Sequence, residues 1–135
     1  MTTTPSLLKG AVAALVVFVV GDFVWHNVLL VDFYSTRLDA INGMHVPLSF
    51  PPFILLFEVI GSLGTAYFVL NMSHSLGQAI FNGAVLGLMM VSAVNFVNHS
   101  LILKWDITIT LVDTLWGIAM GGLSGAAVRM MVARK

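Results

Sequence analysis

Seven polar side chains have the chemistry of a binding site, although they lie in or at the ends of long apolar runs. Carboxylates bind protons and cations, and imidazoles exchange protons near neutral pH or ligate metals. Ionisable groups inside a membrane are costly and are usually functional. The sequence therefore predicts a ligand or ion chamber made of three acids, two histidines and two asparagines: Asp22, Glu58, Asp113, His26, His99, Asn95 and Asn98.

The spacing of these residues supports a shared chamber. Asp22 and His26 are four residues apart, as are Asn95 and His99, so each pair lies on one face of a helix. At about 1.5 Å rise per residue, all seven polar groups fall at a similar depth, in the half of the membrane opposite the chain termini. We call this the outer half. Two tryptophans, each three residues after an acid, are predicted to wall the chamber: Trp25 and Trp116.

Small residues form a stripe on each of two predicted helices, continuing inward from the polar groups. Such small-xxx-small stripes let membrane helices approach closely. The partner of the second stripe could be a helix of the same chain or of a second copy, and the spacing leaves both open. The glycines of the two stripes are Gly83 and Gly87 on the first helix, and Gly117, Gly121 and Gly125 on the second.

The elements that must position these residues are membrane helices. The chain is 59% hydrophobic and 9% charged, whereas soluble domains are near about 45–50% and about 25%. Spans of about 20 apolar residues are expected at about 7–31, 52–72, 76–103 and 107–133, with an interfacial connection at 32–50. We predict one integral membrane domain over residues 1–135, an all-α, up-down-up-down bundle with both termini on one side.

Charge and composition narrow the partners and the topology. The formal net charge is zero, so nucleic-acid binding has no electrostatic support, and without cysteine there is no thiolate metal site. The lipid bilayer is the expected partner. Four basic residues lie on the side of the termini and two on the other, which predicts cytoplasmic termini. The four are Lys9, Arg129, Arg134 and Lys135, and the two are Arg37 and Lys104.

Four segments resemble a known family. They are Asp22-Phe-Val-Trp25, Phe33-Tyr34, Asn95-Phe-Val-Asn98 before Trp105, and Thr110-Leu-Val-Asp113-Thr-Leu-Trp116-Gly117. Together they resemble the four-span bacterial membrane proteins of domain-of-unknown-function family 2177. The resemblance implies a four-helix protein of a bacterial inner membrane or its equivalent, and implies no activity. The chain departs from the family pattern at Val94-Asn95, where Tyr-Asp is expected, and so lacks one acid.

Four functions fit these residues. The chamber could handle a proton, cation or small solute, with a homodimer as the acting unit. The protein could be a structural or accessory subunit of a larger membrane complex. His26 and His99 could ligate a metal, a haem or a chlorin. A membrane enzyme is the least supported function, because the chain has neither cysteine nor a G-x-S-x-G motif. Ion or small-solute handling is the working hypothesis.

Overall fold

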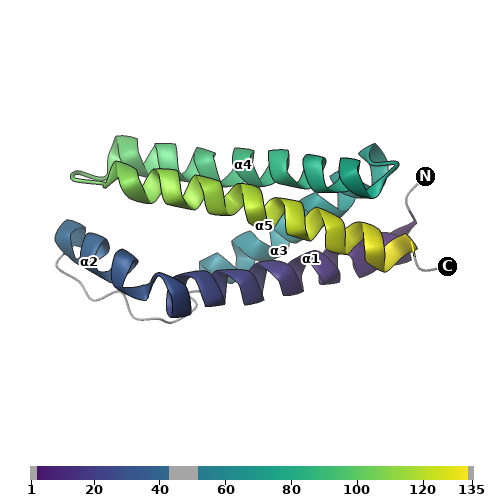
Figure 1. The fold of residues 1–135 in the computed structure, drawn as a ribbon, viewed down its shortest axis with the longest axis horizontal. Helices are drawn as coiled ribbons and strands as arrows, with labels where there is room; N and C mark the ends of the chain where they lie inside the picture. The colour runs from purple at the N-terminus through teal and green to yellow at the C-terminus, as the bar shows by residue number, and fades with distance from the viewer. Residues whose placement is uncertain (1–2, 43–51, 134–135) are drawn as a thin grey trace.

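The structure is a computed structural model that describes residues 3–42 and 52–133, and all regular structure in these ranges is helical. The long helices alternate in direction, so the first and last described residues lie at the same end of the bundle (Figure 1). This confirms the predicted all-α, up-down-up-down fold. The elements are α1 (Thr4–Val24), the π-helical turn η1 (Trp25–Leu29), α2 (Val31–Asn42), α3 (Pro52–Met72), α4 (Leu76–Leu101) and α5 (Ile107–Ala133).

The first span differs most from the expected 7–31. It begins earlier, at Thr4, because Pro5 is well suited to the first turn of a helix. Its α-helical part ends at Val24, where a π-helical turn follows and the Leu30 N–H donates to the Trp25 carbonyl over 2.9 Å. By length and hydropathy, α1 and η1 together form one candidate membrane span, Thr4–Leu29.

The expected interfacial connection at 32–50 is helical in its first part. α2 occupies Val31–Asn42, and its axis turns away from that of α1 toward the outer ends of α4 and α5 (Figure 1). Residues 43–50 of the expected connection lie outside the described residues. The π-helical turn thus marks the place where the chain leaves the membrane span and crosses the outer end of the bundle.

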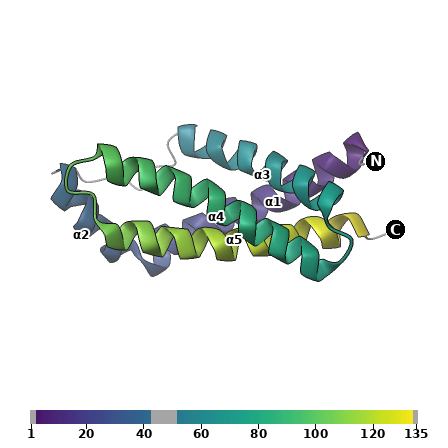
Figure 2. The same cartoon turned by 90° about the horizontal axis from the view of Figure 1, so that it is seen from above.

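The two glycine stripes face each other inside one chain. A Cβ at Gly83 would collide with the backbone oxygen of Gly121, and a Cβ at Gly87 with that of Gly117. Gly125 is equally close to the backbone oxygen of Ala79. α4 and α5 therefore pack backbone against backbone at these glycines, and the two helices cross at an angle (Figure 2). The stripe on α5 finds its partner within the protomer.

Small and branched side chains fill the inner half of the bundle, nearest the termini. The core there comprises Ala11, Ala14, Ala66, Val69, Ala79 and Val128. Gly10 adds to this packing, since a Cβ on it would lie 3.1 Å from Val128 Cγ1 and 3.3 Å from Ala66 Cβ. α1, α3, α4 and α5 are thus drawn together at the inner end, which leaves the outer half for the polar groups.

Many large apolar side chains point outward, as expected for a bundle in lipid. Within the described ranges, four helices are long and apolar enough to cross a membrane: Thr4–Leu29, Ile54–Met72, Leu76–Leu101 and Ile107–Val132. On α3 four consecutive residues, Ile54 to Phe57, are each more than 40% exposed. Acyl chains cover such surfaces in a membrane, so their exposure in the protomer is not a packing defect.

The α4–α5 contact predicts the outcome of a glycine substitution. Gly83→Ala should lower the free energy of unfolding by about 1–3 kcal/mol, because the added methyl forces two backbones apart. Gly64→Ala on α3 is the matched control, since a Cβ there meets nothing within 4 Å. Unfolding of the purified protein in mixed micelles with increasing SDS measures both. Equal stability of the two variants would contradict the close packing.

Candidate functional site

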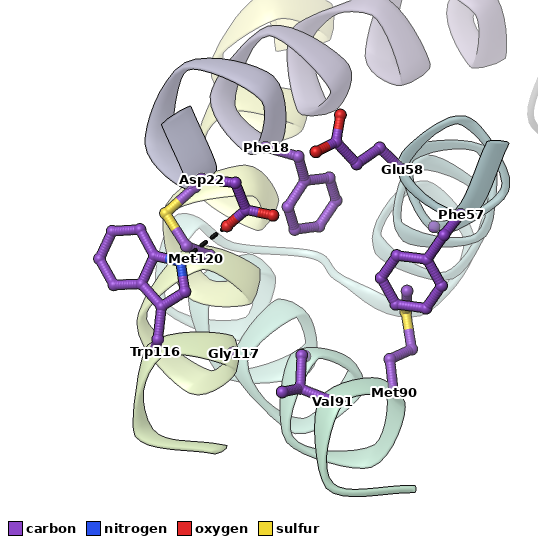
Figure 3. Close-up of a pocket in the computed structure, with 11 residues that line it drawn as sticks. Phe18, Asp22, Phe57, Glu58, Met90, Val91, Trp116, Gly117 and Met120 are labelled. Atoms are coloured by element: carbon purple, nitrogen blue, oxygen red, sulfur yellow. Dashed lines mark hydrogen bonds between the residues drawn. The ribbon is translucent and has the colours of Figure 1, made fainter. Parts of the chain in front are cut away.

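A small pocket lies between α1, α3, α4 and α5, where the polar residues of α1 and α3 meet the outer ends of the glycine stripes (Figure 3). Its cavity volume is about 40 Å³. A water needs about 10–15 Å³ by this measure, so the pocket has room for only a few waters. The lining residues are Phe18, Asp22, Phe57, Glu58, Gly61, Gly87, Met90, Val91, Trp116, Gly117 and Met120.

Asp22 is held by an indole from the opposite helix. Trp116 Nε1 donates a hydrogen bond to Asp22 Oδ1 over 2.7 Å, which joins α5 to the last turn of α1. The Trp116 ring stacks on that of Trp25, with 4.2 Å between centroids and an interplanar angle of 5°. The two predicted wall tryptophans therefore act as a pair, in which Trp25 braces Trp116 and Trp116 orients the Asp22 carboxyl.

Glu58 is the most unusual side chain of the pocket. The residue is only 2% exposed, yet neither carboxyl oxygen has a hydrogen-bond partner among the described residues. From α3 it extends toward α1, and Phe18 lies between it and Asp22 (Figure 3). A buried carboxylate without a partner is costly, so such a group needs a bound proton or a cation to balance it.

Asp113 belongs to a neighbouring cluster nearer the outer end of the bundle. We call this group, made of Asp113, Tyr34 and Trp25, the outer cluster. The Tyr34 hydroxyl on α2 donates a hydrogen bond to Asp113 Oδ1, and it accepts one from Trp25 Nε1 over 3.0 Å. The His26 ring packs against Tyr34, with centroids 4.6 Å apart. The stacked tryptophans link this cluster to the pocket, because Trp25 bonds to Tyr34 while Trp116 bonds to Asp22.

Tyr34 is a residue of this site that the chemistry of the sequence did not single out. It lies in the stretch 32–50, which was expected to be an interfacial connection. In the structure it is 8% exposed and ties α2 to α5. The Phe33-Tyr34 pair was one of the segments that carried the family resemblance, and this was the only sequence signal for it.

The side chains of His26 and Asn95 form hydrogen bonds mainly with backbone oxygens four residues earlier in the chain. His26 Nδ1 lies 3.0 Å from the Asp22 backbone oxygen, which can only accept, so this nitrogen carries a hydrogen. Asn95 is 3% exposed, and its amide donates to the Val91 backbone oxygen over 3.1 Å. Its side chain also lies beside Asp113. Both residues thus border the outer cluster without lining the pocket.

The structure does not bring His99 and Asn98 into the pocket. His99 is exposed and Asn98 is half-buried, and neither side chain has a described contact with the pocket or with the outer cluster. His26 and His99 are therefore not placed as a ligand pair. In the ranges 3–42 and 52–133, no three His, Asp or Glu side chains are grouped in a way that could hold a metal ion.

A second contact docks α2 on the bundle. Arg37 Nε lies 2.8 Å from Asp106 Oδ2, at the start of α5. The Arg37 guanidinium also lies over the Phe33 ring, 3.9 Å from its centroid. Asp106 caps the start of this helix, since its Oδ1 accepts from the Thr108 N–H over 2.8 Å. Hydrogen bonds from the backbone and the side chain of Thr108, followed by the charge of Arg37, lower the pKa of Asp106 below its usual value of 3.8.

Comparison with known proteins identifies the family. The family described as "Predicted membrane protein (DUF2177)" matches residues 7–130, from the first turns of α1 to the last turns of α5. The chain belongs to this family. No curated protein and no solved structure matches it. This DUF2177 protein is thus an integral membrane protein, with four long apolar helices among its described residues.

The Tyr34 hydroxyl predicts a stability change. Tyr34→Phe should lower the free energy of unfolding by about 1–3 kcal/mol, because Asp113 and Trp25 both lose their partner. Tyr67→Phe is the matched control, since Tyr67 is 55% exposed on α3. Denaturation in mixed micelles, followed by tryptophan fluorescence, measures both variants. Similar values for the two would mean that Tyr34 does not anchor α2.

The lowered pKa of Asp106 predicts an acid-sensitive contact. A carboxyl whose pKa is lower in the folded state contributes stability that is full above its unfolded value, here 3.8, and is lost as the pH falls through the folded value. Asp106→Asn should therefore be less stable than the wild type at neutral pH, and this difference should vanish in strong acid. Unfolding curves of both proteins from about pH 7 to about pH 2 test the sign. A difference that is constant over this range would contradict it.

Proposed function

We propose that this protein binds a proton at Glu58 inside the membrane and carries it across, with Asp22 as the second carboxyl of the site. The observation that carries the proposal is the buried Glu58 carboxyl, which has no hydrogen-bond partner in the described part of the chain and lines a pocket with another acid. Intramembrane acids of this kind mark proton and ion pathways.

The electrostatics of the pocket favour this function over a purely structural role. Among the residues that the structure describes, no Lys, Arg or His lines the pocket, so the protein supplies no positive charge to Glu58. Two negative charges near each other in a medium of low dielectric repel strongly. At least one proton or one cation must therefore reside with Glu58 and Asp22, and its release and return constitute the proposed activity.

We propose that the proton reaches the pocket from the side of the outer cluster. Tyr34, Trp25 and Asp113 lie between the pocket and the outer end of the bundle, whereas the inner half is packed with small residues. Transport across the whole membrane then requires movement of the helices. We propose a homodimer as the acting unit, because the pocket between the described helices of one protomer is small, about 40 Å³.

We propose that the protein spans the inner membrane of a bacterial cell, with its termini on the cytoplasmic side. Lys9 lies near the start of α1 and Arg129 near the end of α5, whereas Arg37 lies in α2 and Lys104 lies between α4 and α5. The basic residues 134 and 135 add to the first group and lie outside the described residues. The excess of positive charge near the termini supports this orientation.

The histidine-based alternative has less support. A haem, chlorin or metal held by His26 and His99 needs both rings at one site, whereas His26 packs on Tyr34 and His99 is exposed. A tetrapyrrole is also far larger than the pocket of about 40 Å³. The accessory-subunit alternative explains the bundle but gives no reason for an unpartnered acid in its core.

Proton flux into vesicles tests the proposed function. The protein is reconstituted in vesicles that contain a pH-sensitive dye, and a potassium diffusion potential drives the flux. The wild type should acidify the interior, while Glu58→Gln should reduce the rate to that of protein-free vesicles. Asp22→Asn should lower it partly. Asp32→Asn, which changes an exposed carboxyl on α2, is the matched control and should keep the wild-type rate.

Each result bears on one function. Flux that survives in both Glu58→Gln and Asp22→Asn would contradict proton carriage by this pocket. A wild-type protein that gives no flux, either alone or in its native membrane, would favour the accessory-subunit function.

A further inference from the structure

We infer that the pocket takes a small alkylammonium cation, from methylammonium to tetramethylammonium, in exchange for the proton on Glu58. This inference rests on the proposed function and names the second substrate of the same site. It follows from three properties of the pocket: the few oxygen atoms it offers, the aromatic rings that wall it, and its size.

The first property is the scarcity of oxygen ligands. Among the described residues, two carboxyls line the pocket, those of Asp22 and Glu58, and one oxygen of Asp22 already accepts from Trp116. Hard metal cations need about six to eight oxygen ligands to replace their water shell. The other lining residues are apolar, aromatic or glycine, so the pocket cannot supply such a shell. An alkylammonium ion needs far fewer, because its charge is shared with weakly hydrated methyl groups.

The second property is the aromatic wall. Phe18 lies between the two carboxyls, while Phe57 and Trp116 stand on opposite sides of the pocket (Figure 3). Ring faces attract alkylated ammonium ions, and this attraction grows when water is excluded. Trp116 is held in place by its bond to Asp22 and by its stack on Trp25. Met90 and Met120 complete the wall with thioethers that adapt to the shape of a small ligand.

The third property is size. A cavity of about 40 Å³ holds roughly three waters by the measure used above. This limits the ligand to a few heavy atoms, which matches ammonium ions that carry one to four methyl groups. Large lipophilic cations such as tetraphenylphosphonium are too big for the pocket and serve as a negative control.

The charges around Glu58 make the exchange one-for-one. α1 contributes Asp22, whereas the lining residues of α4 and α5 carry no titratable group. Toward the outer end, the Asp113 carboxylate repels a negative charge on Asp22, whereas a positive charge on His26 attracts it. When the cation enters, the Glu58 carboxyl releases its proton to solvent and the carboxylate pairs with the ammonium ion. The charge of the pocket is unchanged, and no bond of the ligand is broken.

Binding measurements on the full chain in lipid nanodiscs test this inference. Calorimetric titration uses methylammonium, tetramethylammonium and sodium chlorides at equal ionic strength, in two buffers of different ionisation enthalpy. We expect saturable binding of both ammonium ions, none of sodium, and release of one proton per cation. The affinity should then rise on the order of tenfold per pH unit while Glu58 remains protonated in the free protein.

Variants separate the site from general effects. Glu58→Gln should abolish binding, and Asp32→Asn should leave it unchanged. Phe18→Leu keeps both carboxyls and most of the apolar volume, so it should weaken tetramethylammonium binding. Equal affinity of Phe18→Leu and the wild type for tetramethylammonium would overturn the role of the aromatic wall.

The outcomes distinguish this inference from the proposed function. Failure of both ammonium ions to bind, in a protein that still carries protons through Glu58, would overturn the inference alone. Sodium binding as tight as that of methylammonium would also overturn it. Absence of both cation binding and proton flux would overturn the inference together with the proposed function. Binding that is lost in Glu58→Gln and accompanied by proton release supports both.

Discussion

The backbone contact between α4 and α5 is the constraint on which the rest of the structure depends. Glycines on both helices let the two helix backbones touch, where any side chain would hold them apart. This fixes the position of α5, and with it the two residues that reach other helices, Trp116 toward Asp22 and Asp113 toward Tyr34. A looser pair would leave both carboxyls without their donors in a medium that offers no water.

The two carboxyls of the pocket illustrate different solutions to the same problem. Asp22 is satisfied within the protein by the Trp116 indole, whereas Glu58 has no such donor. Protein hydrogen bonds can stabilise a charge permanently, but a group that must take up and release a ligand has to be left unsatisfied by the protein itself. The contrast between the two acids, only one of which is held, supports a division into a positioned and an exchanging carboxyl.

Much of the architecture could be predicted from the sequence, because hydropathy and the spacing of glycines are local signals. The span at 52–72 and the stripes on α4 and α5 needed no tertiary information. The contacts of the site were harder to predict from the sequence. Helical periodicity cannot see a π-helical turn, and so it could not show that Tyr34 turns back to Asp113. Nor could spacing show that His99 faces outward while Asn95, four residues earlier, is buried.

The π-helical turn makes chain length, more than residue type, critical between Asp22 and Tyr34. The extra residue in this turn lets one continuous segment present Asp22 to Trp116 and then Tyr34 to Asp113, two contacts on the same neighbouring helix. Removing one residue from Trp25–Leu29 would rotate the residues beyond it by about 100° around the helix axis relative to Asp22. Apart from Trp25, which stacks on Trp116 and donates to Tyr34, side chains in the turn can therefore vary within the limits of packing, while the number of residues in it is fixed by the geometry on either side.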